Sequence, residues 1–300
     1  MLKVVCGMLA FCLSFFSGSL TASPSSVLGN TASNGVLSRF HQVSCDGTTP
    51  LSFAKPWRIN FDHLPVGKYE DNDWRTDWRC PDWKMGLNLL SVIDGEEAYS
   101  GKSLRIEYPK GVSSCTSETT CVNWKPSLGG DFDALYYGYR VRFPEDFEFV
   151  KGGKLPGIGG GESNSNGNIP TGYDGWSVRM MWDHDAKLVQ YVYHPDQPGK
   201  YGDIMDTKIP VMLDEWMTIQ TKVVMNTLGK KDGVIKTWIN GTVVIDRKNM
   251  QFRKTEDLAI NRLLFAFFFG GYGADWAPSS DQHIYFDDMS VSRTAIFYMD

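Results

Sequence analysis

Short stretches of alternating, β-branched and aromatic residues recur along this chain, and they constrain its fold more than any other feature. Such stretches, bounded by Gly, Pro, Asn and Asp, are typical of β-strands, and no long segment shows a helical period. Many strands with almost no helix predict an all-β fold, a jelly-roll β-sandwich of two antiparallel sheets with a concave groove. The expected strands are Trp57–Phe61, Ser103–Tyr108, Leu135–Phe143, Trp176–Trp182, Leu188–Tyr193, Trp216–Met225, Val234–Ile239, Thr242–Asp246, Arg262–Phe269 and His283–Val291. Between two of them, Asn240-Gly241 predicts a two-residue hairpin turn.

The order of compositions along the chain predicts three segments. Residues 1–22 have a basic start, an apolar run from Val4 to Phe16 and small residues up to Ala22, which is the pattern of a secretory signal peptide cleaved near Ala22. Residues 23–50 are rich in Ser, Gly, Thr and Asn, so we expect a loose N-terminal segment. Residues 51–300 contain no linker and are expected to form one domain. We therefore expect a secreted or periplasmic monomer with no membrane partner.

Four cysteines lie beyond the predicted signal peptide, namely Cys45, Cys80, Cys115 and Cys121. An even number in an exported chain predicts two disulfides. Four cysteines allow three pairings, of which we favour Cys45–Cys80 with Cys115–Cys121. A zinc site is the alternative, but the sequence has no C-x-x-C pair and no clustered histidines.

The formal net charge of −5 argues against a nucleic-acid partner, because nucleic-acid-binding proteins usually carry a basic face. An acidic chain does not attract a polyanion as a whole either, so a polyanion would need a local cluster of cations in a cleft. The stretch containing Asp71, Asp73, Asp77 and Asp82 lacks the ordered spacing of a calcium loop. We interpret it as a solvated loop that contains tryptophans.

Two neighbouring predicted strands bring together side chains that can carry chemistry. Side chains alternate between the two faces of a strand, so Ser177 and Arg179 share one face, as do Tyr191 and Tyr193. If residue 182 pairs with residue 188 in a hairpin, Arg179 faces Tyr191 and Ser177 faces Tyr193, with opposed Cβ atoms about 5 Å apart. A slip of one residue would destroy this arrangement. Tyrosine is also a common strand residue, and arginine is ordinary on a sandwich exterior.

A guanidinium beside two phenols suits the cleavage of a uronic-acid polymer by β-elimination. This reaction removes the C5 proton next to a carboxylate and expels the C4 oxygen. Arg179 can neutralise the carboxylate as a planar bidentate donor. A tyrosine can act as acid or base if a neighbouring cation lowers its pKa, and Lys154 could serve as a second cation in either capacity. No metal or other cofactor is needed.

Five short motifs follow one another over roughly residues 130–292. They are KLPGIGG from Lys154, GWSVRMMW from Gly175, YVY from Tyr191, FAFFFGGYGADWAP from Phe265 and FDD from Phe286. In this order and spacing they resemble polysaccharide lyase family 14. The resemblance implies a β-jelly roll and an enzyme that acts on an anionic polysaccharide, such as alginate or glucuronan, with alginate as the first expectation. The N-terminal third matches nothing that we recognise.

The resemblance also implies roles for individual residues. It makes Lys154 a catalytic or substrate-binding cation, and Ser177 and Arg179 ligands of the substrate carboxylate. Tyr191 and Tyr193 become the acid and base candidates, and which of them takes the proton stays open.

Three further features have two readings each. Arg140 could extend a cationic cleft along the concave sheet together with Arg142, or both could lie on a solvated outer face. Trp276 could stack on a sugar ring or pack at the sandwich edge. The Gly-rich segment Gly157–Gly175 is expected to be a long loop that gates the groove or a disordered tip.

Two other functions compete with a lyase. A non-catalytic carbohydrate-binding jelly roll has the same fold, but a pure binder would rely on exposed tryptophan platforms rather than on grouped phenols and cations. A glycoside hydrolase would need two carboxylates flanking the scissile bond. No acidic pair lies on the implicated strands, and Glu162 and Asp174 lie only in the Gly-rich segment.

Overall fold

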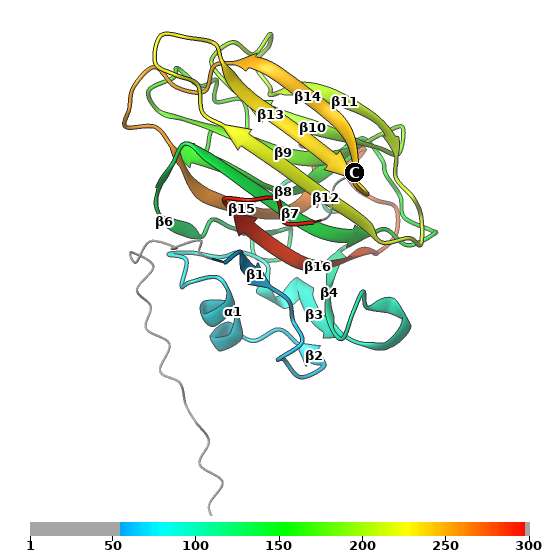
Figure 1. Cartoon of the computed structure of the whole chain (residues 1–300). Coiled ribbons are helices and arrows are strands. Elements are labelled where there is room, and N and C mark those ends of the chain that lie inside the picture. The colour runs from blue at the N-terminus through cyan, green and yellow to red at the C-terminus, as the bar shows by residue number, and fades with distance from the viewer. Residues whose placement is uncertain (1–54, 298–300) are drawn as a thin grey trace, which may run out of the picture. The chain divides into compact units, whose positions relative to one another are not determined.

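The computed structural model describes residues 55–297, and sixteen strands account for nearly half of them (Figure 1). The predicted signal peptide, the segment 23–50 and Cys45 lie outside the described residues, so the Cys45–Cys80 pairing stays a prediction. The strands are β1 (Trp57–Ile59), β2 (Gly67–Lys68), β3 (Leu90–Ile93), β4 (Ser103–Tyr108), β5 (Val122–Trp124), β6 (Ser127–Phe132), β7 (Ala134–Arg142), β8 (Gly152–Gly161), β9 (Gly175–Asp183), β10 (Lys187–Tyr193), β11 (Asp203–Pro210), β12 (Met217–Val224), β13 (Gly233–Ile239), β14 (Thr242–Met250), β15 (Ile260–Phe269) and β16 (Gln282–Ser292).

These strands form two antiparallel sheets, which confirms the predicted β-sandwich. The nine-stranded sheet has the order β14-β13-β12-β7-β16-β4-β3-β2, with β1 paired to β16. The seven-stranded sheet has the order β11-β10-β9-β8-β15-β5, with β6 paired to β15. Short helices occupy the connections: α1 (Asp71–Asp77) and the 3₁₀ turns η1 (Leu87–Leu89), η2 (Gly95–Glu97) and η3 (Ala274–Trp276).

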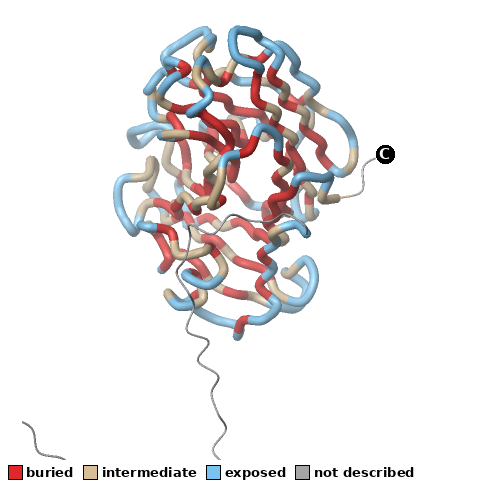
Figure 2. Tube along the Cα trace, turned by 60° about the vertical axis from the view of Figure 1, so that its left-hand side comes forward, coloured by how far each residue is buried: buried red, intermediate tan, exposed pale blue. Residues whose placement is uncertain are grey.

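Aromatic side chains fill the core between the sheets. The Trp182 ring on β9 lies 5.4 to 5.9 Å from four neighbours, centroid to centroid, and meets each nearly edge-on, a favoured geometry for aromatic pairs. Those neighbours are Tyr108, Phe143, Phe147 and Phe269. Figure 2 shows buried residues running along the strands, with the exposed ones gathered in the loops. Core packing therefore accounts for much of the aromatic content of the sequence.

All ten predicted strands are present, but β8 was mistaken for the start of a loop. Its glycines suggested a flexible connector, whereas they allow close packing of this strand. A Cβ on Gly153 would lie 2.0 Å from the Trp182 ring, and one on Gly160 would lie 1.9 Å from the Ala259 carbonyl oxygen. The predicted loop Gly157–Gly175 is thus shortened to residues 162–174, between β8 and β9.

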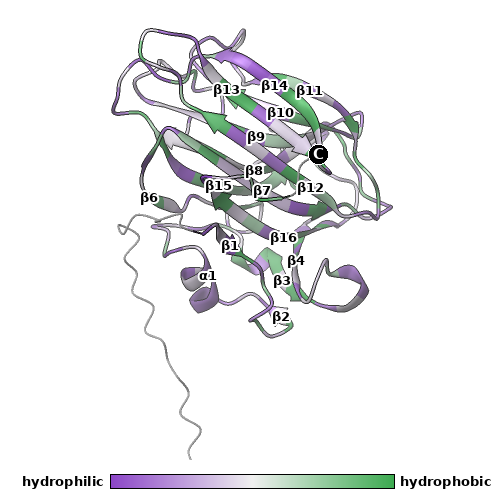
Figure 3. Ribbon diagram, viewed as in Figure 1, coloured by the Kyte–Doolittle hydropathy of each residue, from purple (hydrophilic) through white to green (hydrophobic). Residues whose placement is uncertain are grey.

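The acidic stretch near residue 71 is not the solvated loop that we expected. Its polar residues form the helix α1, which stands out as hydrophilic in Figure 3. Trp74 and Trp78, by contrast, are buried and pack against Trp124 with ring centroids 6.1 and 5.2 Å away. Asp71 accepts a hydrogen bond from Arg75 at 2.8 Å, so its charge is matched within the helix.

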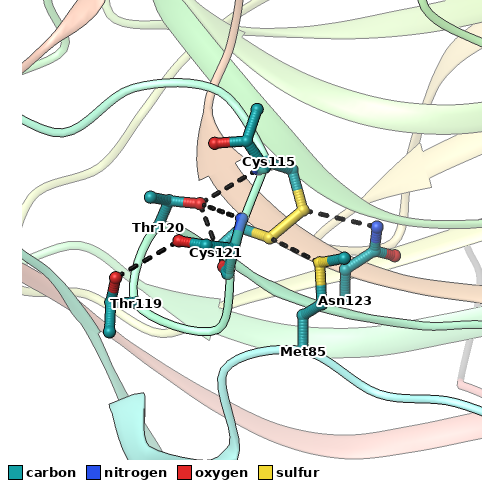
Figure 4. Close-up of a disulfide and its surroundings, with 8 residues drawn as sticks. Met85, Cys115, Thr119, Thr120, Cys121 and Asn123 are labelled. Carbon is teal, nitrogen blue, oxygen red and sulfur yellow. Dashed lines mark hydrogen bonds between the residues drawn. A yellow bond between two sulfur atoms is a disulfide. The ribbon is translucent and has the colours of Figure 1, made fainter.

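Two local predictions about turns and cysteines are confirmed. Asn240 and Gly241 both have positive φ, 49° and 83°, in the two-residue turn between β13 and β14, as the Asn-Gly dipeptide predicts. Cys115 and Cys121 form a disulfide with Cα atoms 5.0 Å apart (Figure 4). Thr120 Oγ1 lies within the loop that this bond closes and accepts hydrogen bonds from the Thr116 and Ser117 amides.

Among residues 55–297, no helix has the length and apolar character needed to cross a membrane.

Candidate active site

The predicted hairpin between β9 and β10 has the predicted register. Leu188 pairs with Trp182, Tyr191 with Arg179, and Tyr193 with Ser177. The alternate residues of both strands, such as Val178 and Val192, belong to the main core. Met181, Val189, Tyr191 and Tyr193 form a separate buried cluster. The four predicted side chains therefore share the face of the seven-stranded sheet that points away from the core, which we call the site face.

Lys154 joins them from β8, where it pairs with Met181 of β9. Its Nζ lies 3.1 Å from the Met181 sulfur and 4.5 Å from the centroid of the Tyr191 ring. Neither neighbour offers a negative charge. Burial, and then the positive charge of Arg179, lower the pKa of Lys154 to about 7. The amine is therefore available both as a cation and as a neutral base near neutral pH.

Arg179 is buried, and the described residues offer it no counter-ion. Only 4 % of the residue is exposed, and its Nε has no hydrogen-bond partner. No carboxylate pairs with it in the part of the chain that the structure describes. Burial lowers its pKa, although an arginine stays protonated in proteins. A buried and unpaired guanidinium is rare and costly, so this side chain is suited to binding an anionic ligand.

The two tyrosines form a hydrogen-bonded pair. Their hydroxyl oxygens lie 3.3 Å apart, and their rings meet edge to face with centroids 5.4 Å apart. Each oxygen also accepts a backbone N–H, Tyr193 from Gly167 at 3.0 Å and Tyr191 from Gly202 at 3.2 Å. Because only one of the two hydroxyl hydrogens can lie between the oxygens, the other is free to point elsewhere.

The expected lowering of a tyrosine pKa by Arg179 is wrong for Tyr191. Burial, and then the hydrogen bond with Tyr193, raise the pKa of Tyr191 well above its usual range. The charge of Arg179 acts in the opposite direction but is the weaker effect. Tyr191 is therefore a proton donor in the resting protein.

Ser177 lies on the site face, but its hydroxyl has a structural partner. Its Oγ donates to the Asn164 carbonyl oxygen at 2.7 Å, and both residues are buried. Asn164 belongs to the loop 162–174, and that loop also supplies the Gly167 amide to Tyr193. Ser177 thus holds the loop against the tyrosine pair, and its predicted contact with substrate stays a prediction.

Arg140 does not join this group. It lies on β7 of the nine-stranded sheet, where its neighbours Tyr139 and Val141 point into the core and Arg140 therefore points outward. Its Nε donates to Asp288 at 3.0 Å, and its guanidinium lies 3.9 Å from the centroid of the Tyr99 ring. The structure therefore places Arg140 on the outward face of the nine-stranded sheet, apart from the other predicted site residues, and its predicted contact with substrate stays a prediction.

Trp276 lies near the Lys154 end of the site face. Gly270 follows β15 and is so close to Lys154 that a Cβ there would lie 2.8 Å from its Nζ. The indole of Trp276 covers Gly271, the next residue, where a Cβ would lie 2.2 Å from the ring. The position is consistent with both readings, stacking on a sugar ring and packing at the sandwich edge, so the predicted contact with substrate stays a prediction.

Two cations on this sheet escaped the sequence analysis. Lys125 directly follows β5, and Arg262 lies on β15, where it pairs with Gly159 of β8. Burial, and then the charges of Arg179 and Arg262, lower the pKa of Lys125 to about 8. Strand alternation could have indicated Arg262, because Leu263 and Phe265 are core residues. Nothing in the sequence indicated Lys125, because the preceding strand β5 is too short to be predicted.

Known proteins resemble this chain in sequence and in fold. The sequence profile of the family described as polysaccharide lyase 14 matches residues 96–289. The structure of alginate lyase Aly36B has a TM-score of 0.68 and 24% sequence identity, covering 84% of this chain and 99% of that one. Variants of Aly36B have been solved with an alginate trisaccharide and a tetrasaccharide.

Two further solved structures are similar. The marine family-14 alginate lyase from Aplysia kurodai has a TM-score of 0.67 and 25% identity, covering 78% of this chain and 97% of that one. The endo-β-1,4-glucuronan lyase from the fungus Trichoderma reesei has a TM-score of 0.50 and 14% identity, covering 77% and 95%. No curated protein sequence matches this chain.

Proposed function

We propose that this chain, which belongs to the polysaccharide lyase 14 family, cleaves a uronic-acid polymer by β-elimination and that alginate is its preferred substrate. The observation that carries the proposal is Arg179, a buried guanidinium without a counter-ion, beside a lysine and two phenols. Alginate is favoured over glucuronan because two alginate lyases share 24% and 25% of their residues with this chain, and the glucuronan lyase 14%.

Arg179 supplies the charge that the reaction needs. Removal of the C5 proton places a second negative charge next to the uronate carboxylate, in an enolate-like transition state. A preorganised and desolvated guanidinium stabilises such charge without having to reorganise. Its planar donors also match a carboxylate in a bidentate pair.

The pKa values of Lys154 and Tyr191 are displaced in opposite directions, which favours Lys154 as the base and the tyrosine pair as the acid. Lys154, with a pKa of about 7, is the group that takes the C5 proton on Nζ. The electron pair left behind forms the C4–C5 double bond, and the C4–O bond breaks. The leaving oxygen takes the free hydroxyl hydrogen of the tyrosine pair. The product has a 4,5-unsaturated uronate at its new non-reducing end.

This assignment departs from the simplest expectation, in which one tyrosine removes the proton and another returns it. The raised pKa of Tyr191 opposes a role as the resting base. Tyr193 accepts a backbone N–H and is paired with Tyr191, so it connects the acid to the loop 162–174.

Purified protein mixed separately with alginate and glucuronan tests the proposal. We expect the ultraviolet absorbance of a conjugated double bond to rise with alginate, and to rise equally in the presence of EDTA. The rise should disappear in Tyr191→Phe and Arg179→Ala variants that remain folded by circular dichroism. Binding of a uronan without any rise in absorbance would instead indicate a carbohydrate-binding module. A rise with glucuronan alone would identify glucuronan, rather than alginate, as the substrate.

We also propose that the protein is exported after removal of residues 1–22. The Cys115–Cys121 disulfide supports an oxidising compartment, since disulfides persist there and are rare in the cytosol. Amino-terminal sequencing of the protein recovered outside the cytoplasm of its host should begin near residue 23. An intact Met1 on the recovered protein would contradict the proposal.

A further inference from the structure

The site face carries cations on both sides of a strip of glycine. Arg262 of β15 and Ser177 of β9 both pair with Gly159, which lies between them on β8. Directly opposed residues of antiparallel strands project to the same side, so Arg262 points to the same side as Ser177. Gly157 pairs with Arg179 in the next row. The central strand therefore puts no side chain between Arg179 and Arg262 in these two rows.

Lys125 stands beside Arg262 on the same side of the sheet. The preceding residue, Trp124, is buried in the main core, so Lys125 points the other way. Its Nζ lies 3.4 Å from the Glu162 carbonyl oxygen at the start of the loop 162–174. The charges of Arg179 and Arg262 both act on Lys125. Lys125 is thus close enough to Arg179 and to Arg262 to be repelled by both.

In the described part of the chain, neither Lys125 nor Arg262 is neutralised by an ion pair. Within residues 55–297, Arg262 has no ion pair or side-chain hydrogen bond, and Lys125 has only the bond to a carbonyl oxygen. Among the described residues, the carboxylate of Glu162 is the only negative group that acts on Lys125, and its effect is the smallest of those that shift the pKa of this lysine. Partly buried cations that repel one another are unfavourable for the folded protein unless an anion binds there.

We propose that Lys125 and Arg262 form a second anion-binding site, which takes the carboxylate of a uronate residue next to the one that is cleaved. The inference rests on the proposed function, because it needs a polymer with a carboxylate on every residue. β15 lies two strands from β9, about 10 Å away between backbones, so Arg262 reaches the site face from the opposite side of β8 to Arg179. The two sites together favour a polyuronate over a neutral glycan.

Lys125→Gln and Arg262→Gln variants test the site, with Lys248→Gln as the matched control. Lys248 is exposed on β14 of the other sheet, so this control removes the same charge far from the site face. We expect each site variant to raise KM for soluble alginate about tenfold, the loss of one charge-assisted hydrogen bond. The kcat should stay within about twofold, because binding away from the reacting carbons is equal in the ground and transition states.

Substrate length gives a second readout that a merely structural role would not produce. Among oligouronates prepared from alginate, the increase in KM should be present for long chains and absent for the shortest one that is still cleaved. Thermal unfolding should show Tm values equal to or above that of the natural protein, because each variant relieves repulsion between cations.

Three results would overturn this site. The first is an unchanged KM in both site variants, and the second is an equal increase of KM in Lys248→Gln. The third is a fall in kcat at constant KM, which would mean that the two residues act in the chemical step. The proposed function is judged separately. Calorimetric binding of alginate to Lys154→Met, with and without each site substitution, measures the second site without turnover. If the natural protein binds alginate but does not cleave it, the proposed function fails and these affinities still decide the inference.

Discussion

Arginines lie on both sheets, but among the described residues only the nine-stranded sheet has arginines that pair with carboxylates. Arg140 donates to Asp288 at 3.0 Å, and Arg142 donates to Asp214 at 3.1 Å. On the seven-stranded sheet, Arg179 is more deeply buried than either, and the described residues give it no carboxylate.

This difference distinguishes the arginines whose ion pairs stabilise the fold from the arginine that is suited to binding an anionic ligand. Burial removes water from an arginine, and attraction to a carboxylate partner offsets much of that desolvation cost. For a buried arginine without a partner, the cost is offset only when an anion binds. We therefore expect opposite consequences on the two faces. Substitution of a paired arginine on the nine-stranded sheet should lower stability and leave activity intact. Substitution on the site face should lower activity and leave stability equal or higher.

The largest expected effect comes from replacing Lys154 with arginine. Lys154→Arg keeps a positive charge but removes a base that can be neutral near pH 7. We expect kcat/KM on alginate to fall about 100- to 10,000-fold, the range for a general base. Lys151→Arg is a control, because Lys151 is exposed and paired with Asp275 at 2.9 Å. Substantial activity in Lys154→Arg would make Lys154 a binding cation instead.

Replacing Arg179 with lysine should have the next largest effect. Arg179→Lys keeps the charge and loses the bidentate donor, so we expect kcat/KM to fall roughly 100- to 1,000-fold with most of the loss in kcat. Arg142→Lys makes the same change on the other sheet and should leave kcat/KM unchanged. Similar losses in both variants would mean that the two faces do not differ in function.

The pH dependence of the natural protein should be smaller and has a definite sign. Lys154 must be neutral to accept a proton, and its pKa is lowered to about 7. We therefore expect kcat/KM to rise about tenfold per pH unit below that value and to level off above it. A fall in kcat/KM as the pH rises through 7 would instead show that the protonated lysine is the active form.

The smallest effect on activity is expected at Arg140. Arg140→Met removes the hydrogen bond to Asp288 and the contact with the Tyr99 ring. We expect the free energy of unfolding in urea to fall by about 1–2 kcal/mol, with kcat/KM unchanged. Lower affinity for alginate at unchanged stability would instead show that Arg140 binds substrate.

Periodicity made much of the fold and part of the site predictable. Strand alternation is a local property, so the face shared by Arg179 and Ser177 follows from their spacing once a strand is assumed. The short β9–β10 connection then favours one register, and the structure has that register. The glycines of β8 misled the analysis because their function is close packing, which depends on the neighbouring strands.

The orientation of Lys154 could not be predicted from strand alternation. It shares the site face with Gly157, three residues later, although strict alternation would place them on opposite faces. The register between β8 and β9 shifts between these two residues, as in a β-bulge, and the shift turns Lys154 toward Tyr191.

By itself, the sequence determined the all-β class, the ten main strands, the Asn-Gly turn and the four chemical groups on β9 and β10. Local periodicity and short-range turn geometry are sufficient for these. Only the tertiary structure decided that Lys154 joins the group and that Arg140 does not. It also decided that Lys125 and Arg262 lie near the group, with no ion-pair partner among residues 55–297. These outcomes depend on strand order, a register shift and burial, which arise from contacts between segments far apart in the chain.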